Sequence, residues 1–332
     1  MPEPGRFRVL VVGCGELGTR HLQAVAGLAE VGRIDIVDPR EVAHTLGKQR
    51  LAEIGESPSG GRYAWHTSID GVASGVDLCV VSTQSDVRVA VTEQVAARVG
   101  CRAFLLEKVA ARSVGEYQRL LAMAAERGLS VWVNCKTRAY PIQKRIKARL
   151  VPGAPLVFTS TGGNHGLTNN GIHAVDLFVF FDDCDAIESN GASIDPDLQP
   201  SKRGATVFDL AGTLRGRTAN GSELMVSLCA GHAAPPLVTV TTPQYRWIID
   251  DMTHDAWESD AASGWAWAPL AFDEDLRVSV MTRAFARDIL RTGTCELPTL
   301  RECWPAHAFV LGELLPHFSE RLHQPLDVCP IA

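Results

Sequence analysis

A glycine-rich turn near the N-terminus constrains the fold of this chain more than any other feature. Gly13, Gly15 and Gly18 fit the pattern G-x-G-x-x-G, directly at the end of the apolar run 8–13. Asp38 follows twenty residues after Gly18, at the end of a second apolar run. A strand, a glycine turn, a helix and a later acid in this order are typical of a doubly wound parallel sheet that binds a dinucleotide.

Each residue of this turn has a predicted role in holding a dinucleotide. Gly13 permits the tight turn, Gly15 lets the backbone approach a pyrophosphate, and Gly18 lets the following helix pack close to the strand. The backbone at Glu16 and Leu17 opens that helix, whose N–H groups and positive dipole end attract phosphate. A structural glycine turn without a ligand is the alternative, and the full strand–turn–helix–acid context disfavours it.

Two charged residues bear on the choice of dinucleotide. Asp38 is expected to accept hydrogen bonds from the adenosine ribose, which favours NAD over NADP. Arg40 follows two residues later and could pair with the extra phosphate of NADP, so NADP remains the alternative. A strand-end cap is the other interpretation of Asp38. Residues after the fourth apolar run are predicted to lie near the nicotinamide end, where ligands gather in such sheets: Ser82, Thr83 and Gln84.

The pattern of the chain changes at about residue 151. Up to there, short apolar runs alternate with helical patterns, which predicts a Rossmann domain over 1–150. Beyond VPGAP at 151–155, strand-like stretches follow one another with short polar turns. The prediction is an α/β chain with a second α+β domain over 151–332, built on an open, mostly antiparallel sheet.

Composition excludes several classes of protein. The net charge is −6 and the basic residues are scattered, which argues against a nucleic-acid partner. No apolar run reaches the ~18 residues that a membrane span needs. The N-terminus resembles no export leader, so a cytoplasmic location is expected. Nine cysteines form no C-x-x-C pair, which predicts free thiols and no metal site.

Ordered motifs along the chain together resemble the Gfo/Idh/MocA family, which includes glucose–fructose oxidoreductase and inositol dehydrogenase relatives. They are GCGELGTRH at 13–21, VVST at 80–83, EK at 107–108, VNC…R…YP at 133–141 and NNGIHAVD at 169–176. The resemblance implies a Rossmann domain followed by an α+β domain, and NAD(P)-dependent redox at a sugar or cyclitol carbon. It also implies an oligomer interface on the open sheet, so a homo-oligomer, dimer or tetramer, is expected.

The resemblance assigns roles to individual residues. The family's E-K-P motif falls on Glu107, Lys108 and Val109, with Glu107 in the cofactor region and Lys108 between nicotinamide and substrate. A cis Lys–Val bond would cost about 3 kcal/mol, so we predict a trans bond. The family's D-x-G-x-H motif ends on His173, the predicted base, but its acid is replaced by Asn169. An amide can hydrogen-bond a hydroxyl and cannot take a proton.

Further contacts to a substrate are predicted around these residues. Arg138 could bind an anionic group, with a surface salt bridge as an equal alternative. His165 and Asn170 are candidate sugar contacts, with loop capping as an equal alternative. Without the resemblance, His173 would be interpreted as a core histidine and Lys108 as a solvated charge.

The predicted function is that of an NAD-dependent dehydrogenase or ketoreductase. Its small-molecule substrate would be a sugar, amino sugar, sugar nucleotide or cyclitol, with Lys108 and His173 at the reacting oxygen, in a role such as carbohydrate biosynthesis. Two alternatives remain: a relative that uses NAD to cleave glycosides without net redox change, and a non-catalytic nucleotide-binding regulator. For the oligomer interface we predict the segment 251–276 and an exposed sheet face carrying Leu224, Val226 and Leu228.

Overall fold

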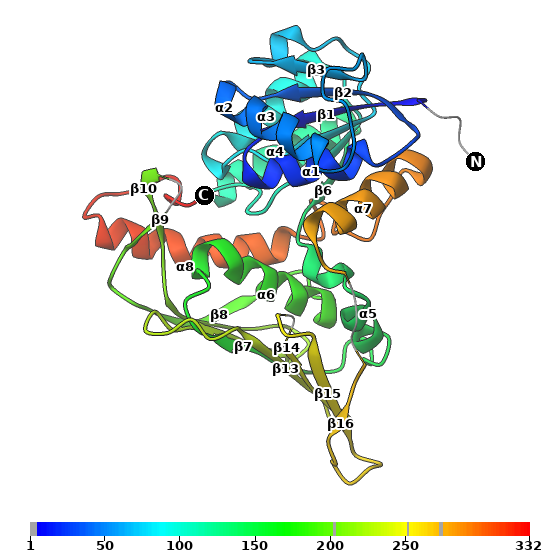
Figure 1. Ribbon diagram of the computed structural model, residues 1–332. Helices are drawn as coiled ribbons and strands as arrows, with labels where there is room; N and C mark the ends of the chain where they lie inside the picture. The colour runs from blue at the N-terminus through cyan, green and yellow to red at the C-terminus, as the bar shows by residue number, and fades with distance from the viewer. Residues whose placement is uncertain (1–4, 202–203, 251, 272–274) are drawn as a thin grey trace. The chain divides into compact units, whose positions relative to one another are not determined.

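Figure 1 shows the computed structural model of the chain, which describes residues 5–201, 204–250, 252–271 and 275–332. The chain forms two compact units. The first unit combines Met1–Ala111, Glu116–Asn134 and Asp275–Arg301. The second unit combines Arg112–Gly115, Cys135–Glu274 and Glu302–Ala332.

These bounds differ from a single boundary between residues 150 and 151. The chain enters the second unit at Cys135 and returns to the first at Asp275. The returning segment is fixed by hydrogen bonds: Tyr117 Oη donates to the Leu300 carbonyl at 2.7 Å, and the Val133 N–H donates to Pro298 at 3.0 Å. Such a return depends on packing between distant segments, so no local pattern marks it.

A parallel six-stranded sheet with the order β3-β2-β1-β4-β5-β6 forms the first unit. This is the strand order of the dinucleotide-binding doubly wound fold, and it confirms the predicted sheet. All six strands coincide with predicted apolar runs. Their bounds are Phe7–Val12 (β1), Val31–Val37 (β2), Tyr63–His66 (β3), Leu78–Val81 (β4), Ala103–Leu106 (β5) and Ser130–Val133 (β6).

Helices connect these strands, and one more comes from the returning segment. Their bounds are Glu16–Ala26 (α1), Glu41–Ala52 (α2), Ser85–Arg98 (α3), Val114–Arg127 (α4) and Val278–Thr292 (α7), with a 3-10 turn at Ile69–Gly71 (η1). Valines recur at every fourth position from 87 to 99, and this spacing predicts that they form the buried face of helix α3. The buried face in the structure is different. Val87 is exposed and Arg88 is buried, because the Arg88 guanidinium bonds backbone carbonyls beneath the helix.

An eight-stranded sheet organises the second unit. Its order is β16-β15-β14-β13-β7-β12-β11-β8, and only β7 and β12 pair in parallel. This confirms the mostly antiparallel sheet. The strands are Val157–Gly162 (β7), Glu188–Ile194 (β8), Gly212–Arg217 (β11), Glu223–Leu228 (β12), Leu237–Thr241 (β13), Tyr245–Asp250 (β14), Asp255–Asp260 (β15) and Ala268–Pro269 (β16). A separate ribbon pairs Gln199–Ser201 (β9) with Gly204–Asp209 (β10).

Helices cover one face of this sheet, with α6 and α8 lying across it in Figure 1. The helical segments are Lys136–Ala139 (η2, 3-10), Pro141–Lys147 (α5), Leu167–Asp182 (α6) and Trp304–Arg321 (α8). The predicted interface face is wrong in one respect. Leu224, Val226 and Leu228 are 3% exposed or less, because they point to the helix-covered side of β12. The open face carries Glu223, Met225 and Ser227 instead.

Two expectations from the composition can be compared with the structure. None of the helices in the described parts of the chain has the length and apolar content that a membrane crossing requires. The nine cysteines are free thiols, as predicted, and six of them are buried. Of the predicted interface segment, residues 251 and 272–274 lie outside the described residues.

Candidate functional site

The glycine turn after β1 has the geometry that its spacing predicts. Gly13 has φ +86°, and a Cβ there would lie 2.8 Å from the Thr83 backbone nitrogen. A Cβ on Gly18 would lie 1.9 Å from the Gly13 carbonyl oxygen, so only glycine permits α1 to pack this closely. Around Gly15 the nearest atom to such a Cβ is the tip of Arg40, at 3.6 Å. The space over Gly15 is therefore bounded by a flexible side chain and not by backbone.

The end of β4 completes a cradle beside this turn. Ser82 Oγ donates to the Gly13 carbonyl at 2.7 Å and so ties the two strand ends together. Thr83 Oγ1 is buried and has no hydrogen-bond partner among the described residues. A buried hydroxyl of this kind is costly unless a ligand or water satisfies it. The open glycine turn and the buried Thr83 hydroxyl both fit a dinucleotide, whose phosphates would meet the start of α1. Gln84, the N-cap of α3, is exposed beside them.

Asp38 lies at the edge of the same cradle and is only 2% exposed. Its Oδ2 accepts from the Cys14 N–H at 2.8 Å, which fixes the carboxylate against the turn. Arg40 covers it, donating from Nε to Oδ1 and from an Nη to Oδ2, both at 3.0 Å. Burial alone would raise the pKa of Asp38, but the hydrogen bonds from Arg40 and Cys14 lower it. The carboxylate thus stays ionised, and the largely exposed Arg40 side chain covers it.

Glu107, predicted in the cofactor region, is held by contacts within the first unit. Its carboxylate is buried, and Oε1 contacts His21 Nε2 at 2.9 Å and accepts from the Asn134 amide. His21 in turn contacts Thr282 on α7 through Nδ1, at 3.0 Å. Burial would raise the pKa of Glu107, but these hydrogen bonds and the His21 and Lys108 charges lower it to about 2. Its buried charge therefore anchors the end of β5 to α1 and α7.

Lys108 follows directly, and the bond between Lys108 and Val109 is cis. The trans bond predicted from the missing proline is therefore wrong. Val109 is fully buried, and its carbonyl accepts a hydrogen bond from the buried Arg88 guanidinium, which also bonds the Thr83 carbonyl. Arg88 thus links the ends of β4 and β5, and nothing in its local sequence pattern indicates this role.

In the second unit, four of the five predicted substrate residues lie in the first half of α6 or just before it: His165, Asn169, Asn170 and His173. Asn169 and His173 are four residues apart on this helix, hence on one face, and both are partly exposed. Asn169 Nδ2 donates to Asp209 Oδ2 at 3.0 Å. Asn170 Nδ2 donates to the His165 carbonyl, which is the loop-capping contact named as its alternative role. Asp209 was not predicted, because it comes from β10, 40 residues away.

Arg138 is buried, at 7% exposure, and not at the surface. Its Nε donates to Asp176 Oδ2 at 2.8 Å, and an Nη donates to Oδ1 at 2.5 Å, a bidentate ion pair. Burial would lower the pKa of Arg138, but the Asp176 charge raises it above its ordinary value. The surface salt bridge considered for Arg138 is therefore a buried one, and its guanidinium holds α6 to the chain before α5.

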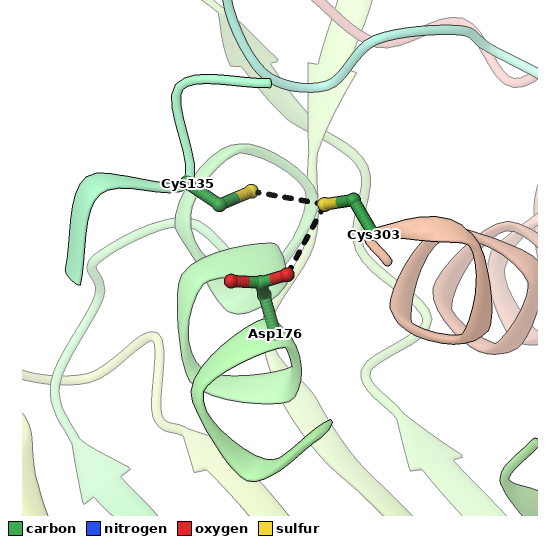
Figure 2. A group of neighbouring side chains, drawn as sticks. All are labelled: Cys135, Asp176 and Cys303. Atoms are coloured by element: carbon green, nitrogen blue, oxygen red, sulfur yellow. Dashed lines mark hydrogen bonds between the residues drawn. The ribbon is translucent and has the colours of Figure 1, made fainter. Parts of the chain in front are cut away.

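Two cysteines, Cys135 and Cys303, lie beside Asp176 of this ion pair, as Figure 2 shows. Cys303 Sγ lies 3.1 Å from Asp176 Oδ1 and 3.5 Å from Cys135 Sγ, and all three side chains are buried. Two thiols and a carboxylate at these distances are a set that can ligate a metal ion. Here, however, Arg138 already occupies both carboxylate oxygens, and burial raises the pKa of Cys303 well above its ordinary value. The chemistry of the set therefore favours a hydrogen-bonded thiol pair over a cation site.

Comparison with known proteins agrees with this geometry. Residues 7–135 match the sequence model of the Gfo/Idh/MocA oxidoreductase family, described as having an NAD-binding Rossmann fold. The part of the chain over residues 7–135 thus resembles the NAD-binding domain of the Gfo/Idh/MocA family. The match confirms the predicted resemblance and the NAD-type cofactor over the part that holds the glycine turn, Asp38 and Lys108. The comparison with curated proteins found no match.

Solved structures share the fold over nearly the entire chain. UDP-N-acetylglucosamine 3-dehydrogenase GnnA from Acidithiobacillus ferrooxidans is 18% identical, with TM-score 0.69 over 96% of this chain and 98% of that one. A mutant of KijD10, a 3-ketoreductase from Actinomadura kijaniata in complex with TDP-benzene and NADP, is 17% identical, with TM-score 0.70 over 93% and 96%. The super-repressor mutant of Gal80p from Saccharomyces cerevisiae is 14% identical, with TM-score 0.73 over 98% and 97%. At these identities the similarity establishes the fold alone.

Proposed function

We propose that this protein is an NAD-dependent dehydrogenase or ketoreductase that acts on a secondary alcohol or ketone of a sugar-like molecule. The observation that carries the proposal is the cradle of the first unit. It combines an open Gly15, an ionised Asp38 for the ribose, and a buried Thr83 hydroxyl for which the described protein provides no partner. Lys108 follows directly on the anchored end of β5.

Asp38 supports NAD over NADP as the cofactor. Its carboxylate would accept hydrogen bonds from the ribose hydroxyls and would repel an added phosphate. Arg40 must first release the carboxylate, and its 60% exposed side chain has room to do so. The same release would free the guanidinium for a phosphate, so the balance between these two residues sets the preference.

Two side chains divide the chemistry at the reacting oxygen in this proposal. His173 takes the hydroxyl proton in oxidation and returns it in reduction, since histidine has an ordinary pKa of about 6.5. The Lys108 ammonium donates a hydrogen bond to the same oxygen and stabilises its developing negative charge. Bound NAD supplies the hydride acceptor.

Among the possible substrate classes, we propose amino sugars and sugar nucleotides first. Two proteins of the same fold, GnnA and KijD10, are named as a 3-dehydrogenase of UDP-N-acetylglucosamine and a 3-ketoreductase bound to a TDP compound. At the start of α6, the polar side chains of His165, Asn169 and Asn170 suit a molecule with several hydroxyls. Arg138 is an unfavourable contact for an anionic group, because its charge is paired with Asp176 inside the unit.

A nucleotide-binding regulator is the second candidate, and the Gal80p super-repressor favours it as a protein of the same fold. Turnover separates the two functions. The purified protein is mixed with NAD or NADH and a panel of sugars, amino sugars and sugar nucleotides, and the NADH absorbance is followed. A steady change in NADH absorbance with one substrate class supports the proposal of an enzyme. Tight NADH binding with no change across the panel contradicts it and supports the regulator.

Assembly and location are also proposals. We propose a homo-oligomer formed through the open face of the eight-stranded sheet, and a cytoplasmic location. Exposed side chains on strands of this sheet, Val157, Leu237 and Trp257, support the interface because they are apolar. Light scattering at micromolar concentration is expected to give a dimer or tetramer, and a stable monomer would contradict the proposal.

A further inference from the structure

An unassigned carboxylate, that of Asp209, caps the helix that carries His173. Helix α6 begins after Gly166, which offers no side chain to cap the first turn. Asp209 at the end of β10 does so instead. Its Oδ1 accepts from the Thr168 N–H at 3.0 Å and from Thr168 Oγ1 at 2.7 Å. Gly166 leaves room for it, because a Cβ there would lie 2.1 Å from Asp209 Oδ2.

The second carboxylate oxygen sets the orientation of the Asn169 side chain. Asp209 Oδ2 accepts from Asn169 Nδ2 at 3.0 Å. An ionised carboxylate only accepts hydrogen bonds, so the amide must turn its NH₂ group toward Asp209. Its Oδ1 is thereby turned away from the carboxylate as an acceptor. The orientation therefore follows from the chemistry of the pair, although an amide's oxygen and nitrogen look alike in shape.

In this arrangement the negative charge and the hydrogen-bond acceptor available to a substrate belong to different residues. The negative charge belongs to Asp209, and it is fixed by two further donors, Thr168 and the Leu210 N–H at 2.8 Å. The start of a helix favours such a charge through its dipole. The acceptor belongs to Asn169, one turn before His173 on the same helix.

We propose that Asp209 is a positioning residue of the substrate site. It holds the Asn169 amide so that Oδ1 accepts a hydrogen bond from a hydroxyl of the sugar that His173 acts on. This rests on the proposed function, since it requires that the start of α6 meets a polyhydroxylated substrate. Asp209 itself does not touch the reacting atoms, and it acts through Asn169.

An isosteric substitution separates this role from simple helix capping. In Asp209→Asn, the new amide oxygen still accepts from Thr168 and Leu210, so the cap is kept. The new NH₂ group faces the NH₂ group of Asn169, and Asn169 must reverse and present a donor in place of an acceptor. We expect kcat/KM for the sugar to fall by roughly 10- to 100-fold, mainly through KM, as for a lost charge-assisted hydrogen bond. NADH binding should stay unchanged.

The exchange variant Asn169→Asp/Asp209→Asn supplies the rescue. The amide at position 209 then donates to a carboxylate at position 169, which presents an acceptor oxygen to the substrate again. We expect kcat/KM within about threefold of wild type. Asn169→Asp alone sets two carboxylates face to face, which raises the pKa of the pair, so activity should fall as the pair loses its shared proton with rising pH.

Thr168→Val is the matched control for capping. It removes one bond to Asp209 Oδ1 and leaves the contact with Asn169, so it should lower the melting temperature without raising KM. The proposal is overturned if Asp209→Asn leaves KM unchanged, if the exchange variant is no better than Asp209→Asn, or if Thr168→Val raises KM equally.

A readout without turnover keeps this result separate from the proposed function. The side-chain NH₂ signals of Asn169 in NMR spectra of asparagine-labelled protein report its hydrogen-bond partner. Asp209→Asn should shift these signals and speed their hydrogen exchange, and Thr168→Val should not. If wild type converts no sugar, the proposed function fails. Unchanged Asn169 signals in Asp209→Asn overturn the positioning role, whatever the turnover.

Discussion

The two units of this protein build their candidate sites in different ways. In the first unit, the site residues follow the ends of neighbouring parallel strands, at Gly13 after β1, Asp38 after β2 and Thr83 after β4. In the second unit, the residues at the start of α6 are held by side chains far away in sequence, as Asp209 holds Asn169. A parallel sheet brings its strand ends together by topology alone, whereas a mixed sheet with covering helices depends on individual contacts.

Glycine substitutions test the first half of this comparison. Gly15→Ala keeps an ordinary backbone and meets only the tip of Arg40, so folding should be nearly unchanged. The added methyl group is expected to block the approach of the pyrophosphate and to weaken NADH binding by about 100-fold or more, through the loss of charge-assisted hydrogen bonds to phosphate. Fluorescence titration with NADH measures this.

Gly18→Ala should instead destabilise the fold, because its Cβ would overlap the Gly13 carbonyl. The cost is expected at about 3 kcal/mol or more, seen in thermal melting. Gly312→Ala on α8 is the control for both, since nothing lies within 4 Å of its Cβ, and neither property should change. Normal NADH binding by Gly15→Ala would contradict the predicted cradle.

The Arg138–Asp176 pair tests the second half of the comparison, namely that the second unit depends on individual side-chain contacts. Arg138→Met leaves a buried carboxylate without its cation, and we expect a loss of about 3–5 kcal/mol in unfolding free energy. Arg138→Met/Asp176→Leu removes both charges and should lose clearly less. Chemical denaturation of the three proteins measures these values. Equal losses in the single and double variants would show that the pair's charges do not matter.

The pH dependence of stability tests the contribution of the buried Glu107 charge in the first unit. Its pKa is about 2 in the folded chain and about 4.3 in an unfolded one. Its stabilising contribution is therefore complete above about pH 4.3 and is lost as the pH falls toward 2. Melting temperatures from pH 6 to pH 2.5 should fall more steeply for wild type than for Glu107→Gln. Parallel curves would mean that the buried charge contributes nothing.

Cofactor preference should show the smallest effect. Asp38→Ala removes the ribose acceptor and the charge that repels a phosphate, so the ratio of NADH to NADPH affinity should fall by roughly tenfold. Arg40→Ala should raise that ratio, because it removes the phosphate partner. Titration of both reduced cofactors tests this. Tighter binding of NADPH than NADH by wild type would overturn the preference and identify Arg40 as the dominant group.

The sequence predicts the first unit better than the second for a physical reason. The glycine spacing and Asp38 are local requirements of one turn, and the strands of a buried parallel sheet are visible as apolar runs. The sequence indicates neither the cis bond at Lys108–Val109 nor the burial of Arg88, whose guanidinium bonds the Val109 carbonyl. An arginine in a helical pattern is ordinarily solvated, so its sequence gives no sign of burial.

In the second unit, residue types were predicted and their partners were not. The family motif identifies Asn169 and His173 from the sequence. Asp209 could not be found, since a β10 residue reaches α6 only through the pairing of distant segments. The same holds for the thiols of Cys135 and Cys303, which are 168 residues apart in the chain.

The proposed chemistry depends on Lys108 and His173 acting on one substrate oxygen. Turnover of His173→Ala on the substrate found in the sugar panel is the most direct test. We predict a fall of roughly 10²–10⁴, with NADH binding unchanged, and a Lys108→Ala/His173→Ala double variant less impaired than the product of the single effects. Near-normal turnover of His173→Ala would contradict this account, since the proton would then move by another route.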